Sequence, residues 1–151
     1  MNFGGSGIFE ELFNDIRRLV PDGAVILELG SGDVSTQYLG QHYRMVSVED
    51  QLEWLNKHKS TYIHAPLVNG WYDIAVLKTR LPQAYHAILV DGPTGEGNRF
   101  GFVKNLSLFR TDVPIFFDDT NRSPEHLLAE QVAEILGRPV LFYTRHAILP
   151  R

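Results

Sequence analysis

The sequence of 151 residues contains no cysteine, so neither disulfides nor a zinc site built on thiolates contributes to its fold. It also lacks an apolar run of the roughly 18 to 20 residues needed to cross a bilayer. Acidic residues interrupt the apolar positions of the N-terminal segment, which is unlike a signal peptide. We therefore expect a cytoplasmic protein that does not engage a membrane.

Basic residues are in the minority, because 14 Lys and Arg stand against 18 Asp and Glu, giving a formal net charge of -4. Nucleic-acid-binding proteins normally present a basic face, so no nucleic-acid partner is expected. A chain of this length buries roughly two-thirds of its unfolded surface without covalent staples. We predict one domain over residues 1–151, with an N-terminal helix within 1–20 and a core over 24–151.

Short apolar runs alternate with helical patterns along the chain, which predicts an α/β fold with a mostly parallel sheet between two layers of helices. Strands are predicted at 24–29, 44–48, 62–68, 86–90, 113–117, 140–144 and 147–149. Helices are predicted at 6–19, 35–42, 51–58, 102–109 and 123–136. Ser6 and Ser123 are the expected N-caps, and Gly137 follows the last helix. The segment 71–81 fits neither period.

Carboxylates gather where the predicted strands end. Ligands of open α/β sheets bind beyond the carboxyl ends of the strands, so we expect the functional site at this edge. The acids are Glu28, Glu49, Asp50, Asp91, Asp118 and Asp119.

A glycine turn follows the first strand. Gly30 and Gly32 allow a tight turn and close approach of a ligand to the backbone. Glu49 comes 17 residues after Gly32 (49 minus 32) at the end of the second strand, where a carboxylate can accept both hydrogen bonds of a ribose diol. The combination favours an adenosine-containing ligand.

Two adenosine cofactors compete for such a site. A dinucleotide-binding turn has a third glycine where this chain has Ser35, and Glu28 would face the anionic pyrophosphate. A ligand with an ammonium and a sulfonium suits Glu28 better. S-adenosylmethionine carries both groups, so a dehydrogenase is disfavoured.

Four segments resemble motifs of the class I S-adenosylmethionine-dependent methyltransferases. They are ELGSGDVSTQYL (28–39), VSVEDQLEW (46–54), ILVDGP (88–93) and IFFDD (115–119). The resemblance extends over nearly the whole chain and implies a Rossmann-like three-layer sandwich. Its sheet would have seven strands, mostly parallel, with the last strand antiparallel.

The resemblance also implies roles for individual residues. Glu28, Gly30, Ser31 and Gly32 would line the methionine side of the cofactor, and Glu49 would hold the ribose hydroxyls. Asp91 would lie near the transferring methyl or the cofactor amino group, as both a cofactor-binding and a catalytic residue. Asp50 and His64 complete the expected cofactor site, and Trp54 is a candidate shield for the adenine.

The sequence departs from the family pattern in two places. Val34 replaces a glycine common in the first motif. After the third predicted strand, where many relatives place an acid against the adenine, this chain has His64-Ala65-Pro66.

A divalent cation is a second expected cofactor. Asp91, Asp118 and Asp119 end neighbouring strands of this fold, and carboxylates are ligands for Mg²⁺. The arrangement resembles the metal-dependent O-methyltransferases related to the catechol enzymes, whose last acid position is usually Asn. The alternative is that these acids cap loops and pair with Arg99 and Arg122.

The leading hypothesis is O-methyl transfer from S-adenosylmethionine to an unidentified acceptor, assisted by Mg²⁺ or another divalent metal. The acceptor is a small molecule, glycan or protein, met by a lid loop at 94–100 that carries Asn98 and Arg99. Little chain is spare to enclose it, so a large acceptor or a homo-oligomer is expected. The alternative is a catalytically degenerate member that binds a nucleoside ligand or a protein; an aminopropyl transferase ranks lower.

Overall fold

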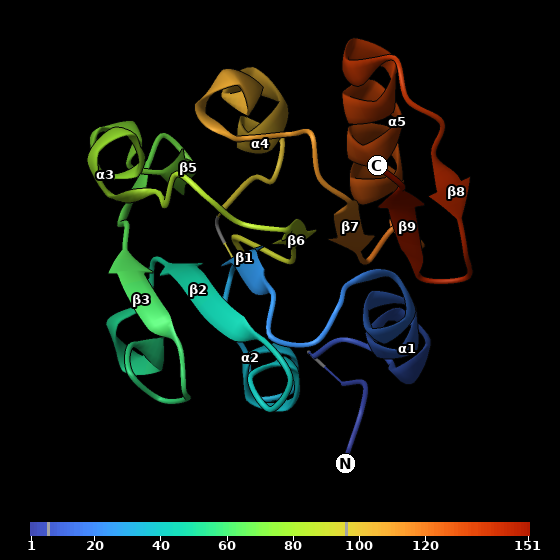
Figure 1. Cartoon of the computed structure of the whole chain (residues 1–151). Helices are drawn as coiled ribbons and strands as arrows, with labels where there is room; N and C mark the ends of the chain where they lie inside the picture. Colours follow the sequence, from blue (N-terminus) through green and yellow to red (C-terminus); the bar gives the residue numbers. More distant parts are fainter. Residues whose placement is uncertain (6, 96) are drawn as a thin grey trace.

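The computed structural model describes residues 1–5, 7–95 and 97–151. A seven-stranded sheet with the order β3-β2-β1-β6-β7-β9-β8 runs through the middle of the molecule (Figure 1). Strands β1, β2, β3, β6 and β7 are parallel, whereas β9 runs antiparallel to both β7 and β8. The predicted topology is therefore confirmed. The strands are β1 (Val25–Leu29), β2 (Arg44–Glu49), β3 (Thr61–His64), β6 (Ala87–Val90), β7 (Ile115–Asp118), β8 (Leu141–Phe142) and β9 (His146–Leu149).

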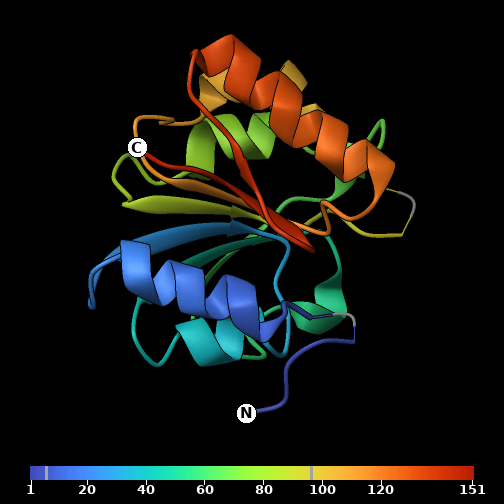
Figure 2. The same cartoon turned by 90° about the vertical axis from the view of Figure 1, so that its right-hand side faces the viewer.

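Helices cover both faces of the sheet. Figure 2 shows α1 (Glu10–Leu19) and α2 (Ser35–Leu39) on one side, and α3 (Ile74–Arg80) and α5 (Ser123–Leu136) on the other. Short α4 (Gly101–Lys104) joins the second group. Side chains of β1 alternate between two cores: Ile26 packs with the α1 residues, and Leu27 packs with the α5 residues. Burial on both faces explains why the central strands are continuous apolar runs.

Helix α1 begins later than predicted. It buries Leu12, Phe13 and Ile16 against the sheet, with acids in its first turn and arginines in its last, an arrangement that the helix dipole favours. Residues 7–9 are not helical, and Phe9 occupies the N-cap position without a side-chain hydrogen bond. The predicted cap, Ser6, lies outside the described residues.

Helix α5 has the predicted bounds. It ends at Gly137, whose φ of +62° is the left-handed conformation that glycine adopts without strain. Its predicted cap is wrong, because Ser123 is the first helical residue and extended Arg122 precedes it, with no side-chain cap bond. Among the residues that the structure describes, no helix has the length and hydropathy to span a bilayer.

The segment 51–58 is not an α-helix. It holds one 3-10 turn, η1 (Leu52–Trp54), after which Asn56 adopts a left-handed φ of +60° that breaks the helical path. Lys57 and His58 then bind Asp33 at 3.2 and 2.8 Å, which holds this segment against the loop after β1. Tertiary contacts therefore override the helical pattern here.

The predicted strand 62–68 is two strands. Pro66 separates β3 from β4 (Leu67–Val68), because proline cannot donate a ladder hydrogen bond. Asn69 and Gly70, with φ of +53° and +80°, then turn the chain into β5 (Trp71–Tyr72), which pairs with β4.

Two further segments each form two elements of secondary structure. Residues 71–81 combine β5 with α3, whose cap Asp73 accepts a hydrogen bond from the Ala75 amide at 2.9 Å. The predicted helix 102–109 is α4 followed by a 3-10 turn, η2 (Leu106–Leu108).

Candidate functional site

A cleft of about 540 Å³ lies at the carboxyl ends of β1, β2 and β6. The loops that follow these strands form most of its wall, together with glycines of the N-terminal segment. Six predicted site residues line the cleft: Gly30, Ser31, Gly32, Glu49, Asp50 and Asp91. Their convergence follows from the parallel topology, which brings the ends of adjacent strands to one edge of the sheet.

Gly30 makes the turn after β1 possible. Its φ is +89°, and a Cβ added there would lie 3.0 Å from both the Asp91 carbonyl oxygen and the Gly92 Cα. Two loop backbones thus cross where only glycine fits without strain. The space beside Gly32 is less crowded, because an added Cβ would meet only the Ser35 Oγ, at 3.5 Å. The turn leaves a backbone cradle that a ligand can approach closely.

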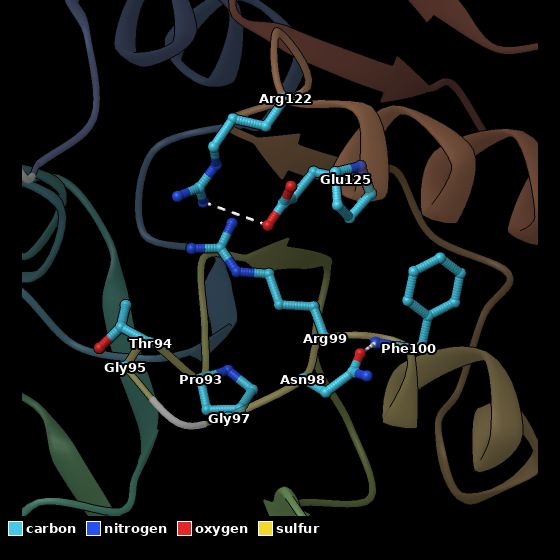
Figure 3. A pocket seen from close by; sticks show the side chains of 10 residues that line it. Pro93, Thr94, Gly95, Gly97, Asn98, Arg99, Phe100, Arg122 and Glu125 are labelled. Atoms are coloured by element: carbon cyan, nitrogen blue, oxygen red, sulfur yellow. Dashed lines mark hydrogen bonds and ion pairs between the residues drawn. The ribbon is translucent and has the colours of Figure 1, made fainter.

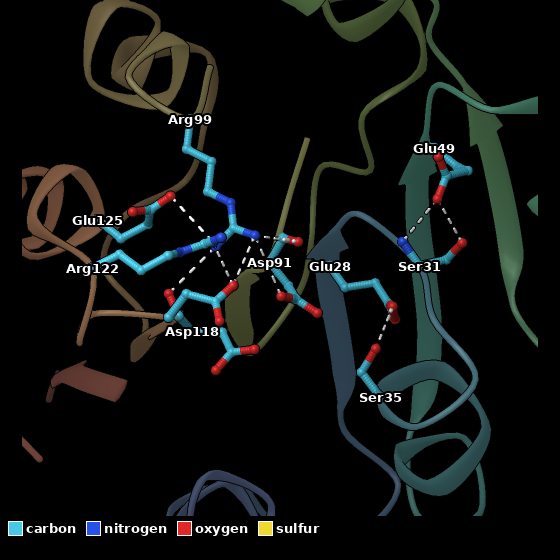
Figure 4. Close-up of polar contacts among 10 residues, drawn as sticks. Glu28, Ser31, Ser35, Glu49, Asp91, Arg99, Asp118, Arg122 and Glu125 are labelled. Carbon is cyan, nitrogen blue, oxygen red and sulfur yellow. Dashed lines mark hydrogen bonds and ion pairs between the residues drawn. The ribbon is translucent and has the colours of Figure 1, made fainter. Parts of the chain in front are cut away.

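Glu49 ties the two loops of the cleft together (Figure 4). One carboxylate oxygen accepts hydrogen bonds from the Ser31 amide at 3.1 Å and the Ser31 hydroxyl at 2.9 Å. The other accepts from the Gln51 amide at 2.9 Å. Each carboxylate oxygen can accept more than one hydrogen bond, so Glu49 keeps capacity for a ligand. Gln51, which also lines the cleft, escaped the sequence analysis.

Glu28 lies behind the glycine turn rather than in the cleft. It is fully buried, and its carboxyl accepts a hydrogen bond of 2.6 Å from the Thr36 hydroxyl, which in turn accepts one of 2.9 Å from the Gly32 amide. Burial raises the pKa of Glu28 to about 8, against the opposing hydrogen bonds from Thr36 and Ser35. The predicted direct contact with a cofactor is corrected: Glu28 has no surface exposed to the cleft.

His64 also lies outside the cleft lining. It ends β3 opposite Glu49, and its Nε2 lies 3.2 Å from the backbone oxygen of Asp50. Asp50 itself lines the cleft, and burial together with the neighbouring charge of Glu49 raises the pKa of Asp50 to about 6. The position of His64 therefore supports the loop that carries Asp50.

Trp54 borders the cleft from the 3-10 turn η1. The Lys57 ammonium lies 4.1 Å from the centre of its indole ring, a cation–π contact that orients the ring. Trp54 is thus held at the cleft by a short turn and not by the predicted helix.

The three aspartates predicted to converge do so. Carboxylate oxygens of Asp91, Asp118 and Asp119 lie within 4.8 Å of one another. Burial, together with the neighbouring charge of Asp118, raises the pKa of Asp91 well above its ordinary value. Burial, together with the neighbouring charge of Asp119, also raises the pKa of Asp118. Asp119 has a left-handed φ of +63°, a conformation that Asp and Asn adopt more readily than other residues with side chains.

Two arginines bind this cluster, as Figure 4 shows. Arg99 contacts the Asp119 carboxylate at 3.1 Å and the backbone oxygens of Asp91 and Asp118 at 3.1 and 3.4 Å. Arg122 contacts the same Asp119 oxygen at 2.7 Å and Glu125 at 3.2 Å. The pairing that competed with a metal site in the sequence analysis is therefore present.

A second cavity of about 590 Å³ adjoins the cleft and shares Pro93 and Thr94 with it. Figure 3 shows Arg99, Arg122 and Glu125 on one side of this cavity, with Pro93, Gly97 and Asn98 along the other. Its position next to the cleft suits a second reactant.

Besides Gln51, sequence reasoning missed Tyr72 and the N-terminal glycines. Tyr72 is fully buried beneath the site, its hydroxyl has no hydrogen-bond partner among the described residues, and a Cβ added to Gly92 would lie 2.5 Å from that hydroxyl. Nothing in the ambiguous segment 71–81 pointed to Tyr72. Gly4, Gly5 and Gly7 also line the cleft, and their glycine-rich sequence was an available signal.

No protein-family model matches the sequence, and no curated protein matches it. Solved structures do resemble the fold. The C-terminal domain of precorrin-6Y C5,15-methyltransferase from Rhodobacter capsulatus has a TM-score of 0.63 and 13% identity, covering 97% of this chain and 91% of that chain. A methyltransferase-like protein from Silicibacter pomeroyi has a TM-score of 0.57 and 21% identity, covering 100% and 89%. MycE methyltransferase from the mycinamycin pathway, in complex with Mg and SAH, has a TM-score of 0.59 and 13% identity, covering 99% and 49%.

The chain has the fold of a class I S-adenosylmethionine-dependent methyltransferase. Glu28 does not face the cleft, so its charge does not exclude a dinucleotide there. The sheet topology disfavours one instead, because β9 runs antiparallel between β7 and β8, whereas the strands of a dinucleotide-binding sheet form a parallel series. Val34, the departure from the first motif of the methyltransferases, packs against Gly7, where an added Cβ would lie 2.5 Å from it.

Proposed function

We propose that the protein is an S-adenosylmethionine-dependent methyltransferase whose cofactor binds in the cleft between the loops after β1 and β2. The observation that carries the proposal is the pairing of the Gly30 turn with Glu49 at the carboxyl edge of a methyltransferase-type sheet. A volume of about 540 Å³ is within the range of small-molecule and cofactor sites.

The residues of the cleft suit the parts of this cofactor. Backbone groups of Gly30 to Gly32 would contact the methionine portion, because the glycines leave the turn accessible. Glu49 would accept hydrogen bonds from the ribose hydroxyls while still holding Ser31 and Gln51. The indole of Trp54 would pack against the adenine, and Asp50 lies beside Glu49 at the polar end of the cleft.

Methyl transfer needs mainly positioning from the protein. The cofactor supplies an activated methyl group on a sulfonium when it is bound. Asp91 lines the cleft next to Pro93 and Thr94, which belong to both the cleft and the adjoining cavity. We assign Asp91 the task of taking the proton from an acceptor hydroxyl, with Asp118 as its partner. This makes O-methyl transfer the expected reaction.

The acceptor would occupy the adjoining cavity of about 590 Å³. Its wall combines guanidinium, carboxylate and backbone groups with the ring of Phe100, so it suits an acceptor with both polar and apolar parts. Small molecules, glycans and proteins all remain candidates. A divalent cation at the three aspartates is the less favoured form of the proposal, because Arg99 already contacts this cluster.

Isothermal titration with S-adenosylmethionine and S-adenosylhomocysteine tests the proposal. The Glu49→Gln variant keeps an oxygen for Ser31 and removes the charge, so we expect affinity to fall about 10- to 100-fold. Glu53→Gln makes the same chemical change at an exposed residue outside the cleft lining and should bind like the wild type. No binding by the wild type at millimolar ligand would refute the proposal.

Cofactor binding without any methyl transfer across a broad acceptor screen would favour the second candidate, a degenerate member that binds a nucleoside ligand or a protein. Its supporting observation is that Arg99 already fills the space among the carboxylates next to the cleft.

A further inference from the structure

We propose that the guanidinium of Arg99 is the resident cation of the Asp91, Asp118 and Asp119 cluster and takes the place of a divalent metal. This inference deepens the proposed function, and it rests on that function only in treating the neighbouring cleft as the cofactor site.

Arg99 reaches the ends of two neighbouring strands at once. Its terminal nitrogens lie 3.1 Å from the backbone oxygen of Asp91, after β6, and 3.4 Å from that of Asp118, at the end of β7. The same side chain lies 3.1 Å from the Asp119 carboxylate and 3.7 Å from the Asp91 carboxylate. The planar donor set of a guanidinium satisfies several fixed acceptors in one plane, which a hydrated cation does not.

These contacts matter for stability because Arg99 is buried. Arg99 is only 7% exposed, and a buried charge persists only when it is paired and hydrogen-bonded. Asp118 is buried too, at 3% exposed, whereas the side chains of Asp91 and Asp119 are 11% and 26% exposed. The acids and the arginine therefore depend on one another: the carboxylates need a nearby cation, and Arg99 needs their oxygens.

A metal would have to compete with Arg99 for these oxygens. The oxygen of Asp119 that binds Arg99 also binds Arg122 at 2.7 Å, so two guanidiniums already share it. Mg²⁺ requires ligand oxygens at about 2.0–2.1 Å in near-octahedral geometry. Bringing the cluster oxygens to that distance would place a dication against the Arg99 guanidinium in a buried site, where like charges repel strongly.

An arginine at the cluster suits a different class of acceptor from a metal ion. A metal site favours acceptors with two adjacent oxygens that chelate the ion, whereas a guanidinium offers only hydrogen-bond donors. Arg99 lines the adjoining cavity as well as touching the cluster. We therefore assign it as a positioning residue, and the acceptor needs one nucleophilic hydroxyl and no chelating pair.

Metal binding and melting temperature test the inference without an acceptor. The first arm titrates the wild-type protein with Mn²⁺, followed by electron paramagnetic resonance. We expect no stoichiometric binding up to about millimolar Mn²⁺, the range in which exposed acidic clusters bind weakly. One tightly bound Mn²⁺ per chain that is lost in Asp118→Asn would overturn the inference.

The second arm uses Arg99→Gln, which removes the buried cation and leaves Arg122, more exposed, in contact with Asp119 alone among the three aspartates. We expect its melting temperature to fall on the order of 10 °C, to recover when Mn²⁺ or Mg²⁺ is added, and one Mn²⁺ to bind. Arg99→Lys keeps the charge and should bind no metal. Arg110→Gln, at an exposed arginine paired with Asp112, is the matched control and should change neither readout.

An Arg99→Gln variant with the melting temperature of the wild type and no metal response would also overturn the inference. If Arg99→Gln does not fold, the wild-type titration still decides, because it needs no variant to show stoichiometric Mn²⁺. Both readouts are independent of cofactor binding. Failure of this inference and failure of the proposed function are therefore distinguishable.

Discussion

The hydroxyl of Thr36 lies 2.6 Å from the carboxyl of Glu28, and this contact connects the carboxyl end of β1 to the start of α2. Through the same hydroxyl, which accepts a hydrogen bond from the Gly32 amide, the pair fixes the shape of the glycine turn. A fully buried acid thus acts on the cleft without touching it.

Glu28 should make stability fall as pH rises. Its pKa is raised on folding from 4.5 to about 8, so the folded protein holds the proton more tightly and loses this stability as pH rises through that window. Glu28→Gln cannot ionise. We expect its unfolding free energy to be close to that of the wild type at pH 5. At pH 9 we expect it to be higher than that of the wild type, by on the order of a few kcal/mol.

Thermal melts from pH 5 to pH 9 check this, with Glu134→Gln as an exposed control on α5. The control should follow the wild type throughout. Parallel curves for wild type and Glu28→Gln would mean that Glu28 titrates normally.

Gly30→Ala should be among the most damaging single-methyl changes in the chain. The added Cβ meets backbone of Asp91 and Gly92 at 3.0 Å, on top of the strain of φ +89°. We expect a loss of about 3–4 kcal/mol in unfolding free energy, and loss of cofactor binding. Gly23→Ala is the matched control, because Gly23 has φ +81° with nothing within 4 Å of an added Cβ. It should cost only about 1–2 kcal/mol. Equal costs in urea titrations would show that the loop crossing contributes nothing.

Asp119→Ala should destabilise the protein more than a comparable surface change. It removes the carboxylate shared by Arg99 and Arg122, and Arg99 is buried. We expect a cost of about 1–3 kcal/mol, since the buried Arg99 loses one of its charged partners. Asp112→Ala breaks the exposed pair with Arg110 and should leave the unfolding free energy close to that of the wild type. Chemical unfolding of both variants gives the comparison, and similar small effects would contradict the pairing described for Asp119.

Asp91→Asn should impair the chemical step once an acceptor is known. Loss of a positioned proton acceptor typically costs about 10²- to 10⁴-fold in rate. We expect kcat to fall in that range while the variant still folds, as circular dichroism would show. A kcat within twofold of the wild type would remove Asp91 from the catalytic role.

Much of the fold was predictable because local signals agreed with it. Continuous apolar runs such as 86–90 and 113–117 gave the central strands, and Gly137 gave the end of α5. All the acids predicted at the strand ends except Glu28 then met at one edge, because the carboxyl ends of parallel strands lie together.

The failures involve contacts between segments distant in sequence. The direction of Glu28 was not readable, because a strand buried on both faces carries no polar alternation to show which face each residue takes. The 51–58 segment follows its contacts with Asp33 rather than its helical pattern. Arg99 donates hydrogen bonds to the backbone oxygens of Asp91, just after β6, and Asp118, at the end of β7, and only the folded chain brings these groups together.

A crystal structure of the protein with S-adenosylhomocysteine tests the central claim most directly. The account predicts ligand density in the cleft between Gly30 and Glu49, with the ribose hydroxyls within hydrogen-bond distance of the Glu49 carboxylate. Ligand bound elsewhere, or an empty cleft at millimolar ligand, would contradict it.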